Sequence, residues 1–176
     1  MNMRFLLMHL PLLLVAGTAW SDQVSLRPPG SAVELRTYGF GLIPFDGSFT
    51  RFHGWMRFDP AKAGACEVVL QIEAASLAMS SLSVRDKIIG PEMMDAARFP
   101  DLTFHGKCQD EAIVGDLTMH GETHPVSLDY TRSARTIVAT GQLRRADWGI
   151  TGSPLTGGSI IRMRVVLPDP LTAQHA

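Results

Sequence analysis

Apolar and polar residues alternate along most of this chain after its first thirty positions. In residues 67–73, for example, Val68, Leu70 and Ile72 share one face of an extended segment. Alternation of this kind is typical of a β-strand that buries one face. The strands we predict cover residues 31–38, 48–58, 67–73, 102–108, 113–119, 126–131, 135–145 and 161–167.

Short turn signals separate these segments, and one stretch breaks the alternation. We predict turns at Asp46-Gly47, Asp59-Pro60 and Gly121-Glu122. Residues 83–98 lack strict alternation, so one or two short helices are expected there, the second ending before Pro100. Strands with one polar face suit antiparallel pairing. About eight of them predict an all-β barrel or sandwich.

The first residues are typical of an export signal. Arg4 supplies a positive charge, residues 5–16 are mostly apolar, and Gly17, Thr18 and Ala19 are small. We therefore predict a signal peptide over 1–19, a single domain over 20–176, and a periplasmic location. No other stretch is apolar enough to cross a bilayer, so stable membrane insertion is not expected. The formal net charge of −1 does not suggest a nucleic-acid partner.

The chain has two cysteines, Cys66 and Cys108, each on the apolar face of its predicted strand. In an oxidising compartment they form a disulfide if the strands are neighbours. As buried thiols they would act as small apolar side chains. The sequence leaves both interpretations open.

Motifs for catalysis are largely missing from the sequence. It has no nucleophile elbow, no phosphate-binding loop and no Cys-x-x-Cys pair. Gly39-Phe40-Gly41 lacks the third glycine of a dinucleotide fingerprint and is predicted to be a turn. His120 and His124 flank a predicted turn and are weak metal candidates, because a third ligand is not evident. We expect no enzymatic activity and no cofactor.

Six segments stand out in order along the chain: Ile72–Leu77, Arg85-Asp86, Met94-Asp95 with Phe99-Pro100, Leu102–Phe104, Gly115–Val126 and Arg145–Ile150. Together they resemble the YceI-like family of exported, polyisoprenoid-binding-like bacterial proteins. No one of the motifs is decisive, but their order and spacing over residues 25–167 are fairly specific.

The resemblance implies an eight-stranded antiparallel, lipocalin-like barrel with an apolar tunnel for a long isoprenoid or similar lipid. The sequence alone favours an ordinary packed core for the large apolar side chains, and the resemblance shifts the expectation to a tunnel. Polar candidates for its mouth are Arg85, Asp95, Arg145 and Asp147, and a pair of Arg145 with Asp147, or of Arg85 with Asp95, would close one end of the barrel. Candidates for its wall are Phe45, Phe49, Phe52, Phe58, Met93, Met94, Phe99, Phe104, Leu117, Met119 and Trp148.

Three positions depart from the family pattern. Met93 and Met94 replace a pair of aromatic residues, Thr37-Tyr38-Gly39 stands where histidine is frequent, and the pair His120 and His124 is unusual. We expect a periplasmic binding or carrier protein for an amphiphile with a long apolar tail, with homodimer formation left open. The alternatives are a metal-assisted enzyme acting on a small apolar substrate and a structural module with a filled core.

Overall fold

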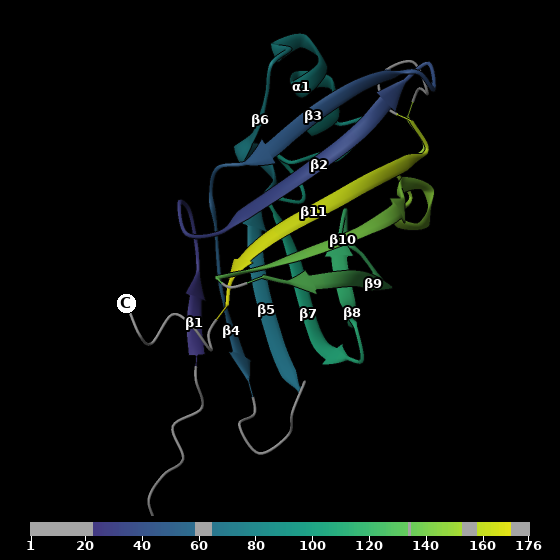
Figure 1. Cartoon of the computed structure of the whole chain (residues 1–176). Coiled ribbons are helices and arrows are strands. Elements are labelled where there is room, and N and C mark those ends of the chain that lie inside the picture. The colour runs from purple at the N-terminus through teal and green to yellow at the C-terminus, as the bar shows by residue number, and fades with distance from the viewer. Residues whose placement is uncertain (1–22, 59–64, 134, 153–157, 170–176) are drawn as a thin grey trace, which may run out of the picture.

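The computed structural model describes residues 23–58, 65–133, 135–152 and 158–169. The predicted signal peptide and the predicted turn at Asp59-Pro60 lie outside these ranges. Within them the chain forms one antiparallel sheet of 11 strands, with one α-helix and two short 3-10 helices (Figure 1). The elements are β1 (Gln23–Leu26), β2 (Ala32–Gly39), β3 (Ile43–Phe49), β4 (Phe52–Phe58), β5 (Cys66–Glu73), η1 (Ala74–Ser76), β6 (Leu77–Met79), α1 (Leu82–Ile89), β7 (Asp101–Gln109), β8 (Ala112–Met119), β9 (Glu122–Arg132), β10 (Thr136–Arg144), η2 (Arg145–Trp148) and β11 (Ile160–Pro168).

The sheet curls so that its two ends approach each other. The strand order is β1-β4-β5-β7-β8-β9-β10-β11-β2-β3-β6, so the consecutive strands β3 and β4 lie near opposite ends of the order. The corner between them holds these ends together. There Thr50 donates its backbone N–H to the carbonyl of Ser76, and Arg51 accepts a backbone bond from Glu73. The all-β, barrel-like fold predicted from the alternation is therefore confirmed.

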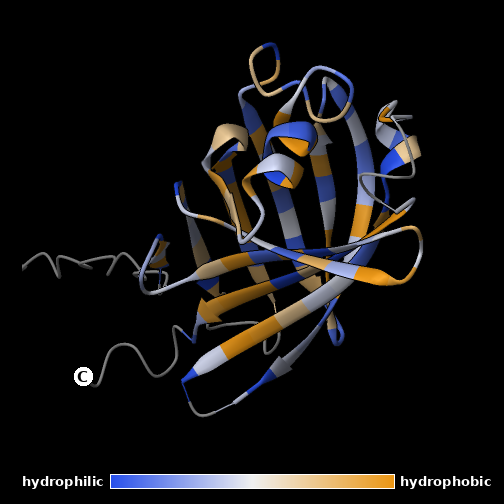
Figure 2. Cartoon of the chain, turned by 90° about the horizontal axis from the view of Figure 1, so that it is seen from above, coloured by the Kyte–Doolittle hydropathy of each residue, from blue (hydrophilic) through white to orange (hydrophobic). Residues whose placement is uncertain are grey.

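Side-chain alternation decides which face of the curled sheet is buried. In β5 the residues at even positions, from Cys66 to Ile72, are buried, and those between them are half-buried. Figure 2 shows the same alternation as bands of apolar and polar residues along the strands. The inward side chains form the core because burying them removes apolar surface from water, at about 25 cal/mol per Å².

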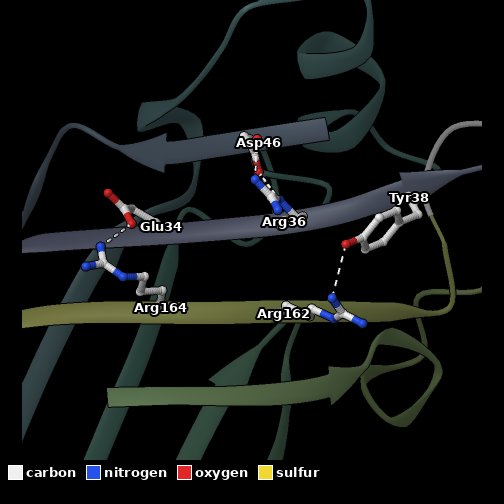
Figure 3. A network of polar contacts seen from close by, with 6 residues as sticks. All are labelled: Glu34, Arg36, Tyr38, Asp46, Arg162 and Arg164. Carbon is white, nitrogen blue, oxygen red and sulfur yellow. Dashed lines mark hydrogen bonds and ion pairs between the residues drawn. The ribbon is translucent and has the colours of Figure 1, made fainter. Parts of the chain in front are cut away.

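Polar pairs cover the outward face of β2, β3 and β11. Arg36 forms two hydrogen bonds with Asp46, and Arg164 bonds to Glu34 (Figure 3). These groups are exposed, so solvent screens the pairs and each contributes little to stability. The pKa of Asp46 is nevertheless lowered, chiefly by its hydrogen bond from Arg36.

Several element boundaries differ from the predictions. The described chain has three strands beyond the eight predicted, because β1 and β6 are short and β3 is separate from β4. The predicted turn at Asp46-Gly47 is wrong: both residues lie inside β3, paired with Arg36 and Leu35. The prediction of a turn at Gly39-Phe40-Gly41 is confirmed, since this segment joins β2 to β3.

The helical region contains one helix followed by turns. The helix α1 begins after Ser81, whose side chain accepts a hydrogen bond from the backbone of Val84, as a helix cap does. It ends at Ile89, before Gly90-Pro91, and residues 91–94 and 96–98 form turns instead of a second helix. No helix in the described ranges is long and apolar enough to cross a membrane.

A disulfide joins β5 to β7. Cys66 and Cys108 lie next to the paired residues Glu67 and Lys107, and their Cα atoms are 4.8 Å apart. Antiparallel neighbours approach to about this distance at positions without direct backbone bonds. The bond closes the end of the β5–β7 pair that lies away from α1.

Candidate functional site

A cavity lies inside the curled sheet at the end that carries α1. About 50 Å³ of the space among its lining side chains is wide enough for the centre of a water molecule. One water needs about 10–15 Å³ of such space, so the cavity is slender. We call it the outer part. Its lining residues are Leu35, Thr37, Phe49, Ile72, Ile88, Met93, Met94, Leu102, Leu117, Met119, Leu143, Arg145, Ile150, Gly158, Ile161 and Met163.

A second cavity lies next to the first, towards the other end of the strands. It too has about 50 Å³ of space wide enough for the centre of a water molecule. We call it the deep part. Four residues line both parts: Ile72, Leu117, Leu143 and Met163. Its other lining residues are Val33, Val68, Leu70, Phe104, Ile113, Val126, Leu128, Ala139, Val165 and Leu167.

The two parts are adjacent, because they share four lining residues, and both are narrow and apolar. The lining runs from Ala139 in β10, beside the deep part, to Arg145, the first residue of η2, beside the outer part. The six steps from residue 139 to residue 145 span at most about 20 Å, and strand tilt in a barrel shortens the distance along the axis. Side-chain and backbone polar atoms are turned away from this space, so it suits a thin apolar chain and does not favour water.

Two methionines reach the outer part from the segment after α1. Backbone bonds hold this segment, with Met94 donating to Ile88 and Asp95 donating to Gly90 at 2.9 and 2.8 Å. Met93 and Met94 are consequently buried, at 6% and 8% exposure. Methionine has three flexible bonds and a polarisable sulfur, so this wall can adapt to the shape of a guest.

Arg145 is a buried cation beside the outer part. Its guanidinium donates to the backbone carbonyls of Ile150, Gly152 and Gly158 and contacts the sulfur of Met93. Among the described residues no carboxylate pairs with it. Burial lowers the pKa of Arg145, although an arginine of this kind stays charged at any physiological pH. The side chain thus fastens the segments on both sides of residues 153–157 to the cavity wall.

Trp148 fills a gap where β9 and β10 separate. The two strands pair only between Ile137↔Arg132 and Thr140↔Asp129, and their remaining residues diverge. The indole of Trp148 is 2% exposed and donates its N–H to the carbonyl of Leu117 in β8. The 3-10 helix η2 therefore closes the opening between the two strands, with Trp148 packed behind the residues that line the cavity.

The two candidate histidines support this tryptophan. The ring of His124 stands edge-on to Trp148 with centroids 5.2 Å apart. His120 bonds through Nδ1 to the backbone carbonyl of Trp148 and packs against Phe99. The described ranges contain no group of three or more potential metal ligands. The geometry thus gives both histidines a packing role.

The wall candidates fall into two groups in the structure. Lining the cavity are Phe49, Met93, Met94, Phe104, Leu117 and Met119. The others lie outside its lining, in three settings. Phe52, Phe58 and Trp148 are buried in the surrounding core, Phe99 packs on His120, and Phe45 is half-buried on β3.

The polar candidates do not form the pairs that would close the mouth. The suggested pairs of Arg145 with Asp147 and of Arg85 with Asp95 are wrong. Arg85 bonds to the carbonyls of Leu77 and Ala75 and to neighbouring Asp86. Asp147 is exposed, and Asp95 is a half-buried residue with a positive φ of 43° in the turn after α1. Arg145 alone of the four lines the cavity.

Sequence reasoning missed several lining residues, including Ile72, Ile88, Leu143 and Met163. Three of them share the inward parity of predicted strands, so alternation already placed them inside. Alternation does not separate a lining position from an ordinary core position. That distinction depends on how closely opposite walls approach, and an aliphatic residue carries no sequence signal of that distance.

Sequence comparison places the chain in a family. A family profile described as the YceI-like domain matches residues 25–167. The chain belongs to the YceI-like family. The resemblance seen in its ordered motifs is therefore confirmed.

Two relatives illustrate the similarity at the level of sequence. A UPF0312 protein of Vibrio cholerae is 31% identical over 122 residues, covering 65% of this chain and 64% of that protein. A UPF0312 protein of Pseudomonas putida is 30% identical over 128 residues, covering 68% and 66%. The chain thus matches just under two thirds of the length of the Vibrio relative.

Solved structures share the fold of this YceI-like chain. BcnA of Burkholderia cenocepacia has a TM-score of 0.65 at 20% identity, covering 79% of this chain and 96% of that one. A polyisoprenoid binding domain from Saccharophagus degradans has a TM-score of 0.60 at 15% identity, covering 84% and 97%. The YceI protein of Campylobacter jejuni has a TM-score of 0.59 at 20% identity, covering 70% and 82%. At identities this low, the similarity in structure shows a common fold and no more.

Proposed function

We propose that this protein binds an amphiphile with a long apolar tail inside its curled sheet and carries it through the periplasm. The observation that supports this most is the pair of adjacent apolar cavities, the outer and deep parts, which share four lining residues. A filled structural core would leave no such space, because protein interiors pack to crystal-like density.

Apolar burial supplies the binding energy in this proposal. Each buried methylene contributes about 0.8 kcal/mol, so a tail that occupies both parts binds firmly without hydrogen bonds. The narrow bore selects an unbranched or lightly branched chain over a bulky ring system. An isoprenoid or similar lipid meets these requirements.

The head of the amphiphile is proposed to lie at the α1 end, near Arg85, Asp95, Arg145 and Asp147. Arg145 acts there mainly by positioning the wall, because three carbonyls already occupy its donors. Selectivity for the head group then comes from the half-buried Asp95 and exposed Asp147, whose side chains remain accessible.

The relatives support the same class of ligand. The Saccharophagus structure is described as a polyisoprenoid binding domain, and its fold corresponds to this one over most of the chain. The YceI-like family is one of binding folds and not a recognised enzyme family, so we propose that the chain acts without catalysis or a cofactor. Export by the predicted signal peptide is part of this proposal.

A cavity-filling variant tests the binding function. In Leu143→Phe the larger ring enters the junction of the outer and deep parts. Val138→Phe is the matched control, because Val138 lies on the same strand and faces away from the buried side of the sheet. Both variants and the wild type would be purified from periplasm and extracted with organic solvent for mass spectrometry of lipids.

We expect an apolar molecule with the wild type and with Val138→Phe, and a reduced amount with Leu143→Phe. Thermal unfolding of each protein shows whether the fold is retained. Recovery of no apolar molecule from any of them, together with no uptake of a quinone that carries a long isoprenoid tail, would contradict the proposal.

A further inference from the structure

The tip of the β2–β3 hairpin exposes a cluster of large apolar side chains. Phe40 is 66% exposed, Leu42 84% and Ile43 52%. No charged residue occurs between Arg36 and Asp46, so the tip is apolar throughout. A Cβ added at Gly41 would meet no atom within 4 Å, which shows that the tip projects into open space. We call residues 40–43 the apolar tip.

Folding does not account for Phe40 at this position. Its φ is 51° and that of Gly41 is 73°, the left-handed region that favours glycine, asparagine and aspartate. At equivalent positive φ angles, the β7–β8 turn uses Asp110 and the β8–β9 turn uses His120. A bulky ring that is strained and exposed at once gains nothing from the fold. Such a residue indicates a surface that meets another apolar phase.

The tip lies directly beyond the outer part of the cavity. Thr37, which lines the cavity, is three residues before Phe40, and its hydroxyl accepts a hydrogen bond from the backbone of Gly158 at 3.0 Å. Figure 1 shows the tip at the same end of the sheet as α1. An apolar chain that leaves this end of the cavity therefore emerges beside the exposed side chains.

A positively charged side chain, that of Arg162, lies against the β2–β3 hairpin close to its tip. Arg162 donates to the hydroxyl of Tyr38 at 3.1 Å, and its guanidinium lies over the Tyr38 ring (Figure 3). No carboxylate pairs with Arg162 among the described residues, whereas Arg36 and Arg164 each have one. From Tyr38 to the tip the chain advances by about 7–10 Å of extended backbone. Interfacial protein segments bury their apolar side chains to a similar depth of about 5–10 Å beneath the lipid head groups.

We propose that the apolar tip docks reversibly on a phospholipid bilayer, with Phe40, Leu42 and Ile43 below the head groups and Arg162 at their phosphates. Docking places the α1 end of the cavity at the membrane surface. Resting on the proposed carrier function, this geometry lets an apolar tail pass between bilayer and cavity without crossing open water.

Flotation with phospholipid vesicles tests the docking directly. The probe is a vesicle of phosphatidylcholine, with and without one third phosphatidylglycerol. The double variant Phe40→Ser/Leu42→Ser is expected to bind at least about tenfold more weakly than wild type. Leu82→Ser is the control, because Leu82 is an equally exposed but isolated residue on α1, at 71% exposure. It is expected to bind as wild type does.

Arg162 supplies a second, independent test. Arg162→Gln is expected to weaken binding about fivefold on vesicles that contain phosphatidylglycerol, with a smaller effect on pure phosphatidylcholine. Uptake of the tailed quinone in solution is measured on the same variants and should not change. The docking and the carrier function can therefore fail separately.

Three outcomes would overturn the docking. If wild-type protein does not float with either vesicle, the tip does not dock on a bilayer. Equal losses of vesicle binding from Leu82→Ser and from the tip variant would show that any exposed apolar side chain contributes and that the tip has no specific role. Sedimentation that finds a wild-type dimer and a monomeric tip variant would assign the tip to a second copy of the chain.

Discussion

The outer and deep parts of the cavity are enclosed by different kinds of wall. Around the deep part every lining residue belongs to a strand, and most are valine, leucine or isoleucine. Around the outer part the lining includes four methionines, a buried arginine and residues from α1 and the turns after it. The deep part thus has a regular wall, and the adjacent outer part has an irregular one.

The difference suggests a division of labour. Branched side chains have few rotamers, and ladder bonds fix the backbone beneath them, so the deep part should keep its shape. Methionines on turns are less constrained, so the outer part should change shape as an apolar chain enters or leaves. Mutations in the deep part should therefore mainly lower stability, whereas mutations in the outer part should mainly change ligand uptake.

The largest expected effect comes from truncating the deep wall. Phe104→Ala removes a buried ring from β7 and should lower the free energy of unfolding by about 3–5 kcal/mol. Met93→Ala removes a buried side chain from a turn that can relax, so its loss should lie near the lower end of about 2–5 kcal/mol. Urea unfolding measures both. A greater loss for Met93→Ala would contradict the division.

Ligand uptake should follow the opposite order. Met93→Ala is expected to change the affinity for the tailed quinone more than Phe104→Ala does, although it costs less stability. The reason is that it reshapes the adaptable wall. A fluorescence titration on variants that remain folded gives this comparison. Equal changes in affinity for Phe104→Ala and Met93→Ala would leave the two walls indistinguishable.

The disulfide should stabilise the deep end without affecting uptake. Cys66 and Cys108 are 42 residues apart, and closing a loop of this length in the unfolded chain stabilises the fold by roughly 2–4 kcal/mol. The double variant Cys66→Ala/Cys108→Ala should lose that amount in urea unfolding while it keeps wild-type uptake. Wild-type protein treated with reductant serves as a second measurement. Unchanged stability in both the double variant and the reduced protein would show that the disulfide does not stabilise the fold.

Arg145 should stabilise the outer end by a smaller amount. Arg145→Met leaves the carbonyls of Ile150, Gly152 and Gly158 without their donor, and we expect a loss of about 1–3 kcal/mol because water reaches part of this segment. Arg145→Lys keeps the charge but not the planar fork, so it should restore only part of the loss. Full recovery in the lysine variant would show that charge alone matters.

The smallest effect should come from Glu67, a half-buried residue near the disulfide. Hydrogen bonds from His105 and then from Arg57 lower the pKa of Glu67 below its usual 4.5. A lowered pKa means that the carboxylate stabilises the fold above pH 4.5 and that this contribution disappears as the pH falls through the folded-state value. Wild type should thus exceed Glu67→Gln in melting temperature at pH 7, and the difference should disappear as the pH falls well below 4.5. A constant difference across this range would contradict the assignment.

Much of the fold could be predicted from alternation alone. Residues 67–73, 102–108 and 113–119 form strands with the expected residues inside, because a period of two leaves one register that buries the apolar face. The order of the six motifs was sufficient to indicate the family. The signals that failed were local: Asp46-Gly47 resembles a hairpin turn, yet pairing with β2 keeps it extended.

The candidate site was less accessible to sequence reasoning. Met93, Met94 and Leu117 were predicted at the wall and line it, whereas Phe52 and Phe58 are buried beside it. Both groups are large, apolar and inward-facing, so sequence cannot tell them apart. Arg145 is instructive too, since its partners are backbone carbonyls and the sequence suggested Asp147.

The sequence by itself determined which side chains face inward and which family the chain belongs to, because both follow from residue type and spacing along the chain. Tertiary structure decided the rest: where β9 and β10 part, how Trp148 fills that gap, and whether opposite walls meet or leave a channel. These features depend on distances between segments far apart in sequence. A pattern of alternation sets the direction of each side chain and leaves open the distance to the side chain across the barrel.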